Sequence, residues 1–190
     1  MSVISTGMQF PEIPFITYSG KTTNTHEASA QHRYTMFWVM RFIGCRFCQY
    51  DMQKLAEGYQ KYVDKDTAVY VVLQSTRESI IELKGEEFEV PYEIVCDIDE
   101  VFYKTLDVKA TATKEDRMPT SEDGKVKLAA KHEAVAACNF SRKTGEGEAQ
   151  QLPALFIVDQ TNTVRYAHYA VNSIDIPEID EQLKLLDSLA

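Results

Sequence analysis

Hydrophobic residues along the chain fall into short unbroken runs, typical of buried strands, and into stretches with helical spacing. The apolar run over residues 34–42 predicts a central strand that leads into Gly44. After Cys48, apolar side chains recur at three- and four-residue steps, which is the spacing of one buried helical face. These side chains are Met52, Leu55, Ala56, Tyr59, Tyr62 and Val63. The pattern therefore predicts a strand, a short loop and an amphipathic helix over residues 34–63.

The same alternation continues further along the chain. Residues 68–73 form a continuous β-prone apolar run, of the kind found in strands that are buried on both faces of a parallel sheet. We expect Ser75 to cap the next helix, with Glu78 completing a capping box and Gly85 ending the helix. Residues 94–96 predict a third strand. Another helix is expected to open at residues 97–100 and to bury three side chains, Val101, Phe102 and Leu106.

Both ends of the chain also carry patterns. Residues 10–24 predict a hairpin that turns at Ser19 and Gly20 and leads the chain into the sheet. Residues 25–33 fit either a helical turn or a loop.

A second hairpin is predicted over residues 151–169, followed by a helix from residue 175 that covers one face of the sheet. Pro153 should stand at the first residue of this hairpin, because proline cannot donate a hydrogen bond inside a central strand, and a cis bond is an option there. His168, on its second strand, is interpreted as a surface or hydrogen-bonded strand residue.

Residues 107–150 form a polar, broken insert. An unstructured insert of this length is unusual in a compact domain, and strong helix formers predict a helix over residues 125–138. Its inward face is expected to carry Val126, Ala129, Ala130, Ala134 and Ala137. Cys138 would then be buried or would approach the active site, where a second resolving thiol is a minor alternative.

Composition narrows the class of protein. The 190 residues are 44% hydrophobic, which fits a single globular domain over residues 1–190. The 20 basic and 29 acidic residues give a net charge of 20 − 29 = −9, which disfavours non-specific binding to nucleic acid or to an anionic membrane. Four cysteines are too few for a disulfide scaffold, and residues 1–3 lead into no signal sequence. We therefore expect a cytoplasmic protein.

The chemistry is expected at Cys45 and Cys48, a Cys-x-x-Cys pair between a strand and a helix. Cys45 should lie just outside the first helical turn and Cys48 within it. Backbone N–H groups at a helix N-terminus lack intrahelical partners and carry the positive end of the helix dipole, so they stabilise a thiolate. Because the thiolate is the nucleophile, this position predicts redox chemistry.

Two other interpretations of the pair remain open. A zinc or iron–sulfur site would use the same cysteines, but zinc needs two more ligands, and neither Cys96, Cys138 nor the four histidines form a second close pair. A redox-regulated interaction module without turnover is the other alternative. We predict no metal and no cofactor.

Taken in order, these elements resemble the thioredoxin fold, a central mixed sheet flanked by helices, with an N-terminal hairpin and a partly helical insert. The stretch 41–45, the segment 97–106 and the strand Phe156-Ile157-Val158-Asp159 resemble the alkyl hydroperoxide reductase and thiol-specific antioxidant family. More narrowly, the chain is similar to peroxiredoxin-like redoxins with a Gly-Cys-x-x-Cys site. The likeness covers about residues 10–107 and 146–190.

The resemblance implies roles for individual residues. In the thioredoxin pattern Cys45 attacks and Cys48 resolves the mixed disulfide, whereas in the peroxiredoxin pattern Cys48 matches the attacking cysteine. The threonine and proline typical of that second pattern are replaced by Cys45 and Arg41, and its later arginine by Pro153. Either Arg41 or Arg46 can supply positive charge instead.

The sequence thus predicts an oxidoreductase that cycles Cys45 and Cys48 between dithiol and disulfide to reduce peroxides or protein disulfides. Electrons would come from an external thioredoxin- or glutaredoxin-like dithiol, and the resemblance is compatible with a homodimer. Pro153, Arg46 and Trp38 are the expected partner-binding residues, with Trp38 and Phe42 interpreted as core residues. Asp51 is interpreted as a first-turn carboxylate that favours the helix dipole, with a proton relay as the weaker alternative.

Overall fold

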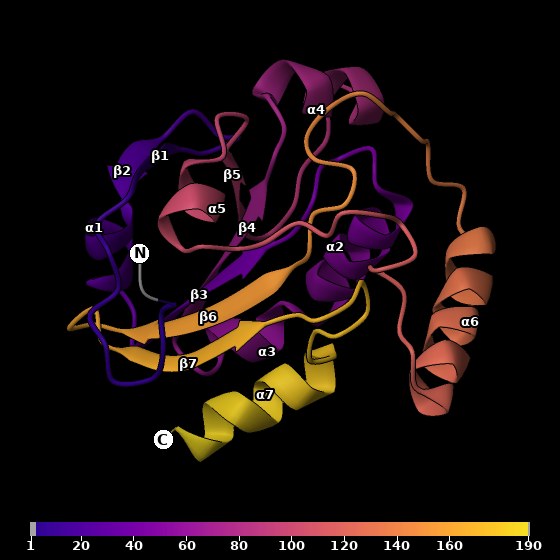
Figure 1. Ribbon diagram of the computed structural model, residues 1–190. Coiled ribbons are helices and arrows are strands. Elements are labelled where there is room, and N and C mark those ends of the chain that lie inside the picture. Colours follow the sequence, from indigo (N-terminus) through magenta and orange to yellow (C-terminus); the bar gives the residue numbers. More distant parts are fainter. Residues whose placement is uncertain (1–2, 190) are drawn as a thin grey trace.

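A five-stranded mixed sheet with strand order β5-β4-β3-β6-β7 forms the centre of the computed structural model, which describes residues 3–189 (Figure 1). Strand β3 pairs in parallel with β4 and antiparallel with β6, so it lies in the middle of the sheet. The strands are β3 (Tyr34–Val39), β4 (Thr67–Leu73), β5 (Glu93–Cys96), β6 (Ala154–Asp159) and β7 (Val164–Tyr169). This arrangement confirms the predicted thioredoxin-like α/β architecture.

Seven helices and a separate hairpin surround this sheet in the described part of the chain. The helices are α1 (Thr25–Ser29), α2 (Arg46–Gly58), α3 (Gln60–Val63), α4 (Arg77–Lys84), α5 (Val101–Thr105), α6 (Glu122–Ala136) and α7 (Ile179–Ser188). Strands β1 (Pro14–Ile16) and β2 (Thr22–Asn24) form the predicted hairpin as a two-stranded sheet of their own. The hairpin is therefore separate from the central sheet and leads the chain through α1 into β3, and Thr17 makes an isolated bridge to Val95 on β5.

Alternate residues of β3 build two hydrophobic cores, one on each face of the sheet. Met36 and Trp38 belong to the core under α2 and α7, where Leu55 and Leu186 are buried. On the opposite face, Phe37 stacks on Phe10 with ring centroids 5.2 Å apart, and Phe102 and Phe156 complete an aromatic cluster. The site described below lies on the first face, at the end of β3.

Several predicted boundaries and caps need correction. Strand β3 ends at Val39 rather than at Phe42. Val39 pairs with Ala154, the first residue of β6, and the residue before Ala154 is Pro153, which has no N–H to continue the hydrogen bonds between the two strands. Thr76, not Ser75, caps α4 by accepting the Ser79 N–H at 3.1 Å. The final helix begins at Ile179 after Glu178, beyond the predicted start. Gly85 does end α4, at a positive φ of 90°.

One predicted helical face needs a single correction and another is wrong. At α5, Phe102 and Leu106 are buried as predicted but Val101 is 40% exposed, and Asp97 accepts the N–H groups of Val101 and Phe102 at the start of this helix. Helix α6 exists but runs over Glu122–Ala136, and its predicted inner residue Val126 is 68% exposed. Its buried residue is Val135, and Lys131 lies on the same side of the helix, facing α2.

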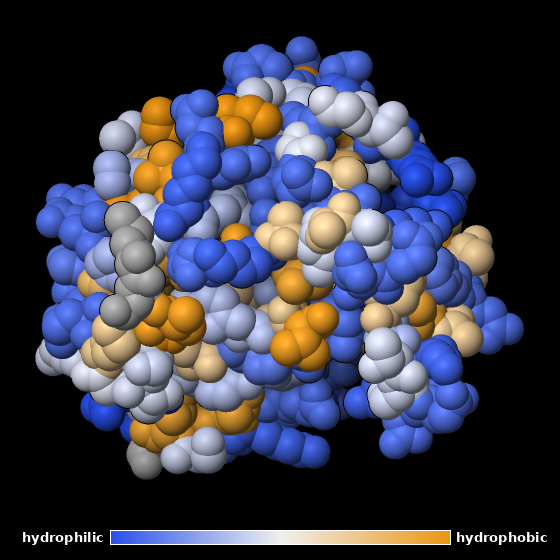
Figure 2. Space-filling view, in the orientation of Figure 1, coloured by the Kyte–Doolittle hydropathy of each residue, from blue (hydrophilic) through white to orange (hydrophobic). Residues whose placement is uncertain are grey.

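The surface is mostly hydrophilic in the view of Figure 2, with hydrophobic residues in separate groups. Helix α6 lies at the outer edge of the fold beside α2 (Figure 1). Within residues 3–189, no helix is both long and apolar enough to cross a membrane. The prediction of one domain over residues 1–190 also includes residues 1, 2 and 190, which lie outside the described residues.

Candidate active site

Cys45 and Cys48 occupy the start of α2 as predicted. Cys45 is the N-cap residue, with extended backbone, and its Sγ accepts the backbone N–H of Cys48 at 3.4 Å. A cysteine in this position replaces the side-chain oxygen that usually satisfies a free N–H at a helix start. The fold therefore holds one sulfur against the positive end of a helix and the other within its first turn.

The surroundings of Cys45 favour its thiolate. A hydrogen bond from the Cys48 thiol, the positive charge of Arg41 and the backbone N–H groups of Cys48 and Phe47 together lower the pKa of Cys45 to about 6, against the opposing effect of burial. Arg41 Nη1 lies 3.4 Å from Cys45 Sγ. At neutral pH Cys45 is therefore mostly ionised.

Cys48 has the opposite character. Its pKa is raised well above the ordinary value because its thiol donates a hydrogen bond to Cys45, and burial and the negative charge of Cys45 add to this effect. The pair thus consists of a thiolate at Cys45 and a protonated thiol at Cys48. This division matches the thioredoxin pattern, in which the first cysteine attacks.

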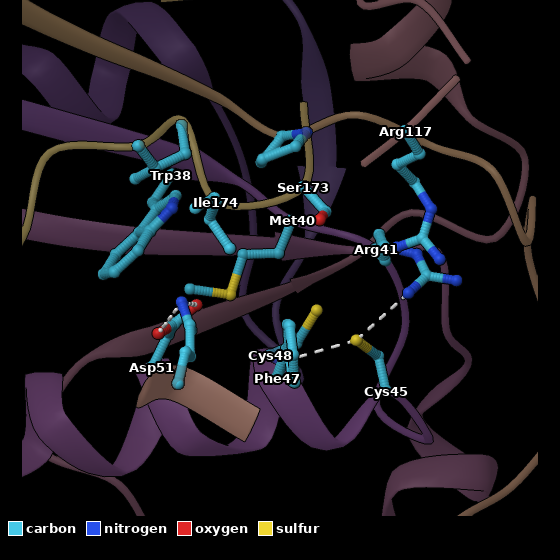
Figure 3. Close-up of a pocket in the computed structure, with 13 residues that line it drawn as sticks. Trp38, Met40, Arg41, Cys45, Phe47, Cys48, Asp51, Arg117, Ser173 and Ile174 are labelled. Carbon is cyan, nitrogen blue, oxygen red and sulfur yellow. Dashed lines mark hydrogen bonds and ion pairs between the residues drawn. The ribbon is translucent and has the colours of Figure 1, made fainter. Parts of the chain in front are cut away.

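Both sulfurs face a small enclosed cavity (Figure 3). Cys45 is only 7% exposed and Cys48 only 6%. The centre of a water-sized sphere can move through about 30 Å³ of the cavity. A volume of about 10–15 Å³, measured in the same way, is enough for one water molecule. Besides the two cysteines it is lined by Trp38, Met40, Arg41, Phe47, Asp51, Arg117, Lys131, Pro153, Ser173, Ile174 and Ile176.

Arg41 is fixed at the edge of this cavity. Its guanidinium lies over the Phe42 ring, 5.0 Å from the centroid, and Nη2 donates to the Ala149 carbonyl. Its Nε is buried without a hydrogen-bond partner among residues 3–189, and the same holds for the hydroxyl of Ser173 across the cavity. Since buried polar groups are rarely left unpaired, these two atoms mark where a small polar molecule can bind.

Arg117 is the functional candidate that the sequence did not reveal. It comes from the insert, is 9% exposed, and its Nε donates to Gln150 at 3.2 Å. Burial and the nearby charge of Arg41 lower its pKa. Figure 3 shows the two guanidinium groups side by side above Cys45. No periodicity singles out one arginine in a polar segment, so only the folded chain identifies it.

Asp51 and Lys131 form an ion pair at the other end of the cavity. Lys131 Nζ lies 2.7 Å from Asp51 Oδ1, and the two side chains are only 14% and 20% exposed. Asp51 lies in the second turn of α2 rather than the first, so it does not serve the helix dipole as predicted. Burial raises the pKa of Asp51 to about 6, although Lys131 opposes this rise.

A loop of the insert, residues 141–149, packs against Gly44 next to Cys45; we call it the covering loop. Ser141 accepts a hydrogen bond from Gln49 on α2 at 2.8 Å, and Glu146 accepts from Ser75 at 3.1 Å and from the Thr76 N–H at 3.3 Å. Ser75 also accepts the Ile43 N–H, which explains why it does not cap α4. The insert is thus held against the segment that carries the two cysteines.

Gly44 shows how closely the covering loop packs. A Cβ at this position would lie 2.2 Å from the Lys143 carbonyl oxygen, so the two backbone segments approach closer than any other residue type permits. The glycine before the first cysteine is therefore required by contact with the covering loop.

The structure brings most of the predicted site residues together. Trp38 and Pro153 line the cavity with both cysteines, and peptide bonds are trans throughout residues 3–189, including that of Pro153. Arg46 is exposed and lies outside the cavity lining, so its role in partner binding stays a prediction. Trp38 and Phe42 are both buried, as core residues should be.

The remaining cysteines and His168 lie apart from the cavity. Cys138, after the end of α6, donates to the Ala134 carbonyl at 3.4 Å and does not line the cavity. Burial raises the pKa of Cys96 to about 11, which keeps it protonated. His168 Nε2 lies 2.7 Å from the Asp175 carbonyl oxygen. No cluster of three or more histidine, cysteine or acidic side chains suited to a metal ion is found in the described chain.

Known structures share this architecture. The peroxidoxin BcpB from Mycobacterium tuberculosis matches with a TM-score of 0.68 and 10% identity, over 98% of this chain and 99% of that one. Mycobacterium bovis AhpC matches with a TM-score of 0.67 and 14% identity, over 100% and 94% of the two chains. The reduced 2-Cys peroxiredoxin of Plasmodium vivax matches with a TM-score of 0.67 and 12% identity, over 98% and 82%. At such identities the likeness shows a common fold.

The five-stranded mixed sheet, its flanking helices and the buried dithiol at the start of α2 define a dithiol protein with a thioredoxin-like fold. The model of the AhpC/TSA family matches residues 6–167, and the chain belongs to this family. No curated protein sequence is detectably similar to it.

Proposed function

We propose that the protein reduces small peroxides, with Cys45 as the attacking thiolate and Cys48 as the resolving thiol. The observation that carries this proposal is the ionised, buried Cys45 beside a cavity of about 30 Å³, which has room for a peroxide group and excludes a folded partner. Membership of the AhpC/TSA family supports the same chemistry.

The reaction proceeds in three steps. The Cys45 thiolate attacks one peroxide oxygen, the O–O bond breaks, and the departing alkoxide or hydroxide takes a proton, which leaves a sulfenic acid on Cys45. Cys48 then attacks this sulfur, forming the Cys45–Cys48 disulfide and releasing water. An external dithiol, thioredoxin- or glutaredoxin-like, reduces the disulfide and is itself oxidised.

The donors that polarise the O–O bond differ from those of the peroxiredoxin sequence pattern. Arg41 and Ser173 line the cavity, and each has a buried polar atom without a hydrogen-bond partner among residues 3–189; Arg117 adds a second positive charge. Preorganised donors in a site without bulk water stabilise developing negative charge more strongly than they do in water. We infer that these three residues replace the missing threonine and proline.

A kinetic comparison of Cys45→Ser and Cys48→Ser tests the proposal. With hydrogen peroxide, Cys48→Ser should accumulate a sulfenic acid on Cys45 that dimedone traps, while Cys45→Ser should react at least 100-fold more slowly than the unaltered protein. Peroxide consumption by Cys45→Ser at the unaltered rate would instead make Cys48 the attacking residue and overturn the assignment.

Exchange with protein disulfides is the second candidate, and the place of Pro153 in the cavity beside both cysteines favours it. Such exchange requires the covering loop to move, because a protein disulfide must touch Cys45 Sγ directly. Stopped-flow oxidation by peroxide and by a disulfide-bonded protein, measured on the same preparation, separates the two. Faster reaction with the protein disulfide would favour this second function.

A further inference from the structure

The Asp51–Lys131 ion pair has no role in the attack of Cys45 on a peroxide. Its Asp51 Oδ2 and Oδ1 atoms both contact Lys131 Nζ, at 2.9 and 2.7 Å. Helix α6 buries only Val135 among its described residues, so hydrophobic packing does not account for Lys131 being driven against α2. Buried ion pairs add little net stability, because removing two charges from water offsets their attraction. The pair therefore calls for a functional explanation.

The Asp51–Lys131 ion pair lies close to Cys48 on helix α2. Asp51 follows Cys48 by three residues on α2, which places the two side chains as neighbours on one helical face. Figure 3 shows the Asp51 carboxylate and the Cys48 thiol on the same side of the helix, with Met40 beside them, and both line the cavity. The cavity volume exceeds that of one water molecule, so a water can connect the two groups.

Formation of the disulfide requires a group that can accept the proton of Cys48. Cys48 is protonated while Cys45 is a thiolate, and it must lose its proton to attack an oxidised Cys45. We propose that Asp51 accepts the proton of Cys48 through water in the cavity, and that Lys131 keeps Asp51 ionised and oriented for this transfer. This inference rests on the proposed dithiol–disulfide cycle.

The step balances. The Cys48 thiol gives its proton to the Asp51 carboxylate, the Cys48 thiolate forms the S–S bond with the sulfenic sulfur of Cys45, and the S–O bond breaks. The departing hydroxide takes the proton back from Asp51 and leaves as water. Asp51 ends the step ionised, as it began, and no further reactant is needed.

The charges around Asp51 suit a proton acceptor at neutral pH. Burial raises its pKa to about 6, Lys131 on α6 lowers it, and Glu178 before α7 and the Cys45 thiolate raise it. Asp51 is thus ionised above about pH 6 and protonated below. A base whose pKa lies close to the working pH transfers protons most effectively.

The second step can be measured without a peroxide. With 4,4′-dithiodipyridine, attack by Cys45 releases one thiopyridone, and attack by Cys48 on the mixed disulfide releases a second. In the unaltered protein the rate of the second release should rise with pH around 6 and then level off. In Asp51→Asn it should be at least tenfold slower at pH 7 relative to the first release, and the inflection near pH 6 should vanish.

Three further variants control the result. Glu57→Gln removes an exposed carboxylate from the same helix and should leave both releases unchanged. Lys131→Met keeps the carboxylate but removes its cation, so the inflection should move to higher pH; a merely structural pair would not shift it. Asp51→Asn combined with Lys131→Met avoids a buried unpaired cation if the single variant folds poorly.

Failure of the proposed role of Asp51 and failure of the proposed function would give different results. An unchanged second release and pH profile in folded Asp51→Asn, or in the double variant, would overturn the role of Asp51. A Cys45 that reacts with dithiodipyridine but not with peroxide would overturn the proposed function instead, while the second release still tests Asp51.

Discussion

Two identical side chains, three residues apart, have opposite ionisation in this protein. Cys45 accepts hydrogen bonds from Cys48 and Arg41 at the start of α2, and Cys48 donates one from inside the first turn. The hydrogen bond between the two thiols is the largest cause of this difference, and the charge of Arg41 and the backbone N–H groups that reach the N-cap side chain lower the pKa of Cys45 further. This arrangement makes Cys45 the more nucleophilic of the two sulfurs.

Replacing Arg41 by Met tests the contribution of its charge. Loss of the cation 3.4 Å from Cys45 Sγ should raise the pKa of Cys45, reduce the thiolate fraction, and slow alkylation by iodoacetamide about 3- to 10-fold at pH 7. The pH dependence of alkylation measures the shift. Arg46→Met removes an exposed arginine at the first position of α2 and should leave the profile unchanged; an equal effect of both variants would contradict a specific role for Arg41.

The low pKa of Cys45 also predicts how stability depends on pH. Its pKa falls from an ordinary 9.0 to about 6 on folding, so between these values the unfolded chain holds a proton that the folded protein has lost. The free energy of unfolding of the reduced protein should therefore rise with pH from about 6 to 9, and this contribution should level off below about 6, where both states hold the proton. Urea unfolding at several pH values measures this slope.

Cys45→Ser should lose this slope. Cys96→Ser should keep it, because burial raises the pKa of Cys96 to about 11 and holds that thiol protonated in the folded protein. Equal slopes for Cys45→Ser and the unaltered protein would show that Cys45 is not ionised near neutral pH.

At the scale of residues, the sequence identified the cysteines, their placement and Arg41 as a source of positive charge, but not Arg117. The Cys-x-x-Cys pair carries its own local signal, because the helix that follows is strongly periodic. Arg117 has no such signal, since its position depends on an insert whose path is set by tertiary hydrogen bonds such as that from Ser173 N–H to the Arg117 carbonyl. Spacing along the chain does not encode that contact.

At the scale of elements, the covering loop packs against Gly44 and α6 contributes Lys131 to the cavity lining. Helix α6 was predicted from composition, but its inward face was wrong because it docks through Lys131 on Asp51 and through His132 against Phe47, with ring centroids 4.7 Å apart. A periodicity of apolar residues cannot reveal a face that is held by polar contacts. The strands, whose burial is hydrophobic, were located within a few residues.

Gly44→Ala should disturb the covering loop. The added Cβ would collide with the Lys143 carbonyl, so we expect a loss of about 1–3 kcal/mol of stability and faster labelling of Cys45 by a bulky thiol reagent. Thermal unfolding and labelling rates measure the two effects.

Gly58→Ala, at the last residue of α2, provides the matched control. Its Cβ would make an ordinary 3.4 Å contact with Ile179, and stability should stay the same or increase slightly. Unchanged labelling in Gly44→Ala would show that the covering loop does not limit access to Cys45.

At the scale of the whole molecule, the sheet separates the chemistry from half of the core. Phe102 is fully buried in the aromatic cluster on the face opposite the cysteines. Phe102→Ala should cost about 3–5 kcal/mol of stability through the cavity it leaves, without changing the pKa of Cys45 in the folded protein. Denaturant unfolding and the alkylation profile test both parts; a shifted profile would mean that the two faces are coupled.

The fold as a whole was the most predictable level. Alternating strands and helices with long apolar runs leave few ways to assemble a mixed sheet. Strand β3 was visible in the sequence as an apolar run, and all of its residues are buried in the structure. The hairpin β1–β2 shows the limit of this argument, because its sequence pattern does not indicate whether it pairs with the central sheet or forms a separate sheet, as it does here.

The covering loop has a consequence for turnover. Under the proposed function, a peroxide can reach Cys45 while residues 141–149 pack against Gly44, but a dithiol protein must bring its own sulfur into line with the Cys45–Cys48 bond. Regeneration would then begin with an opening motion whose rate is independent of peroxide concentration. At saturating peroxide and reductant, that motion would set a ceiling on throughput, and the hydrogen bonds of Glu146 would determine its height.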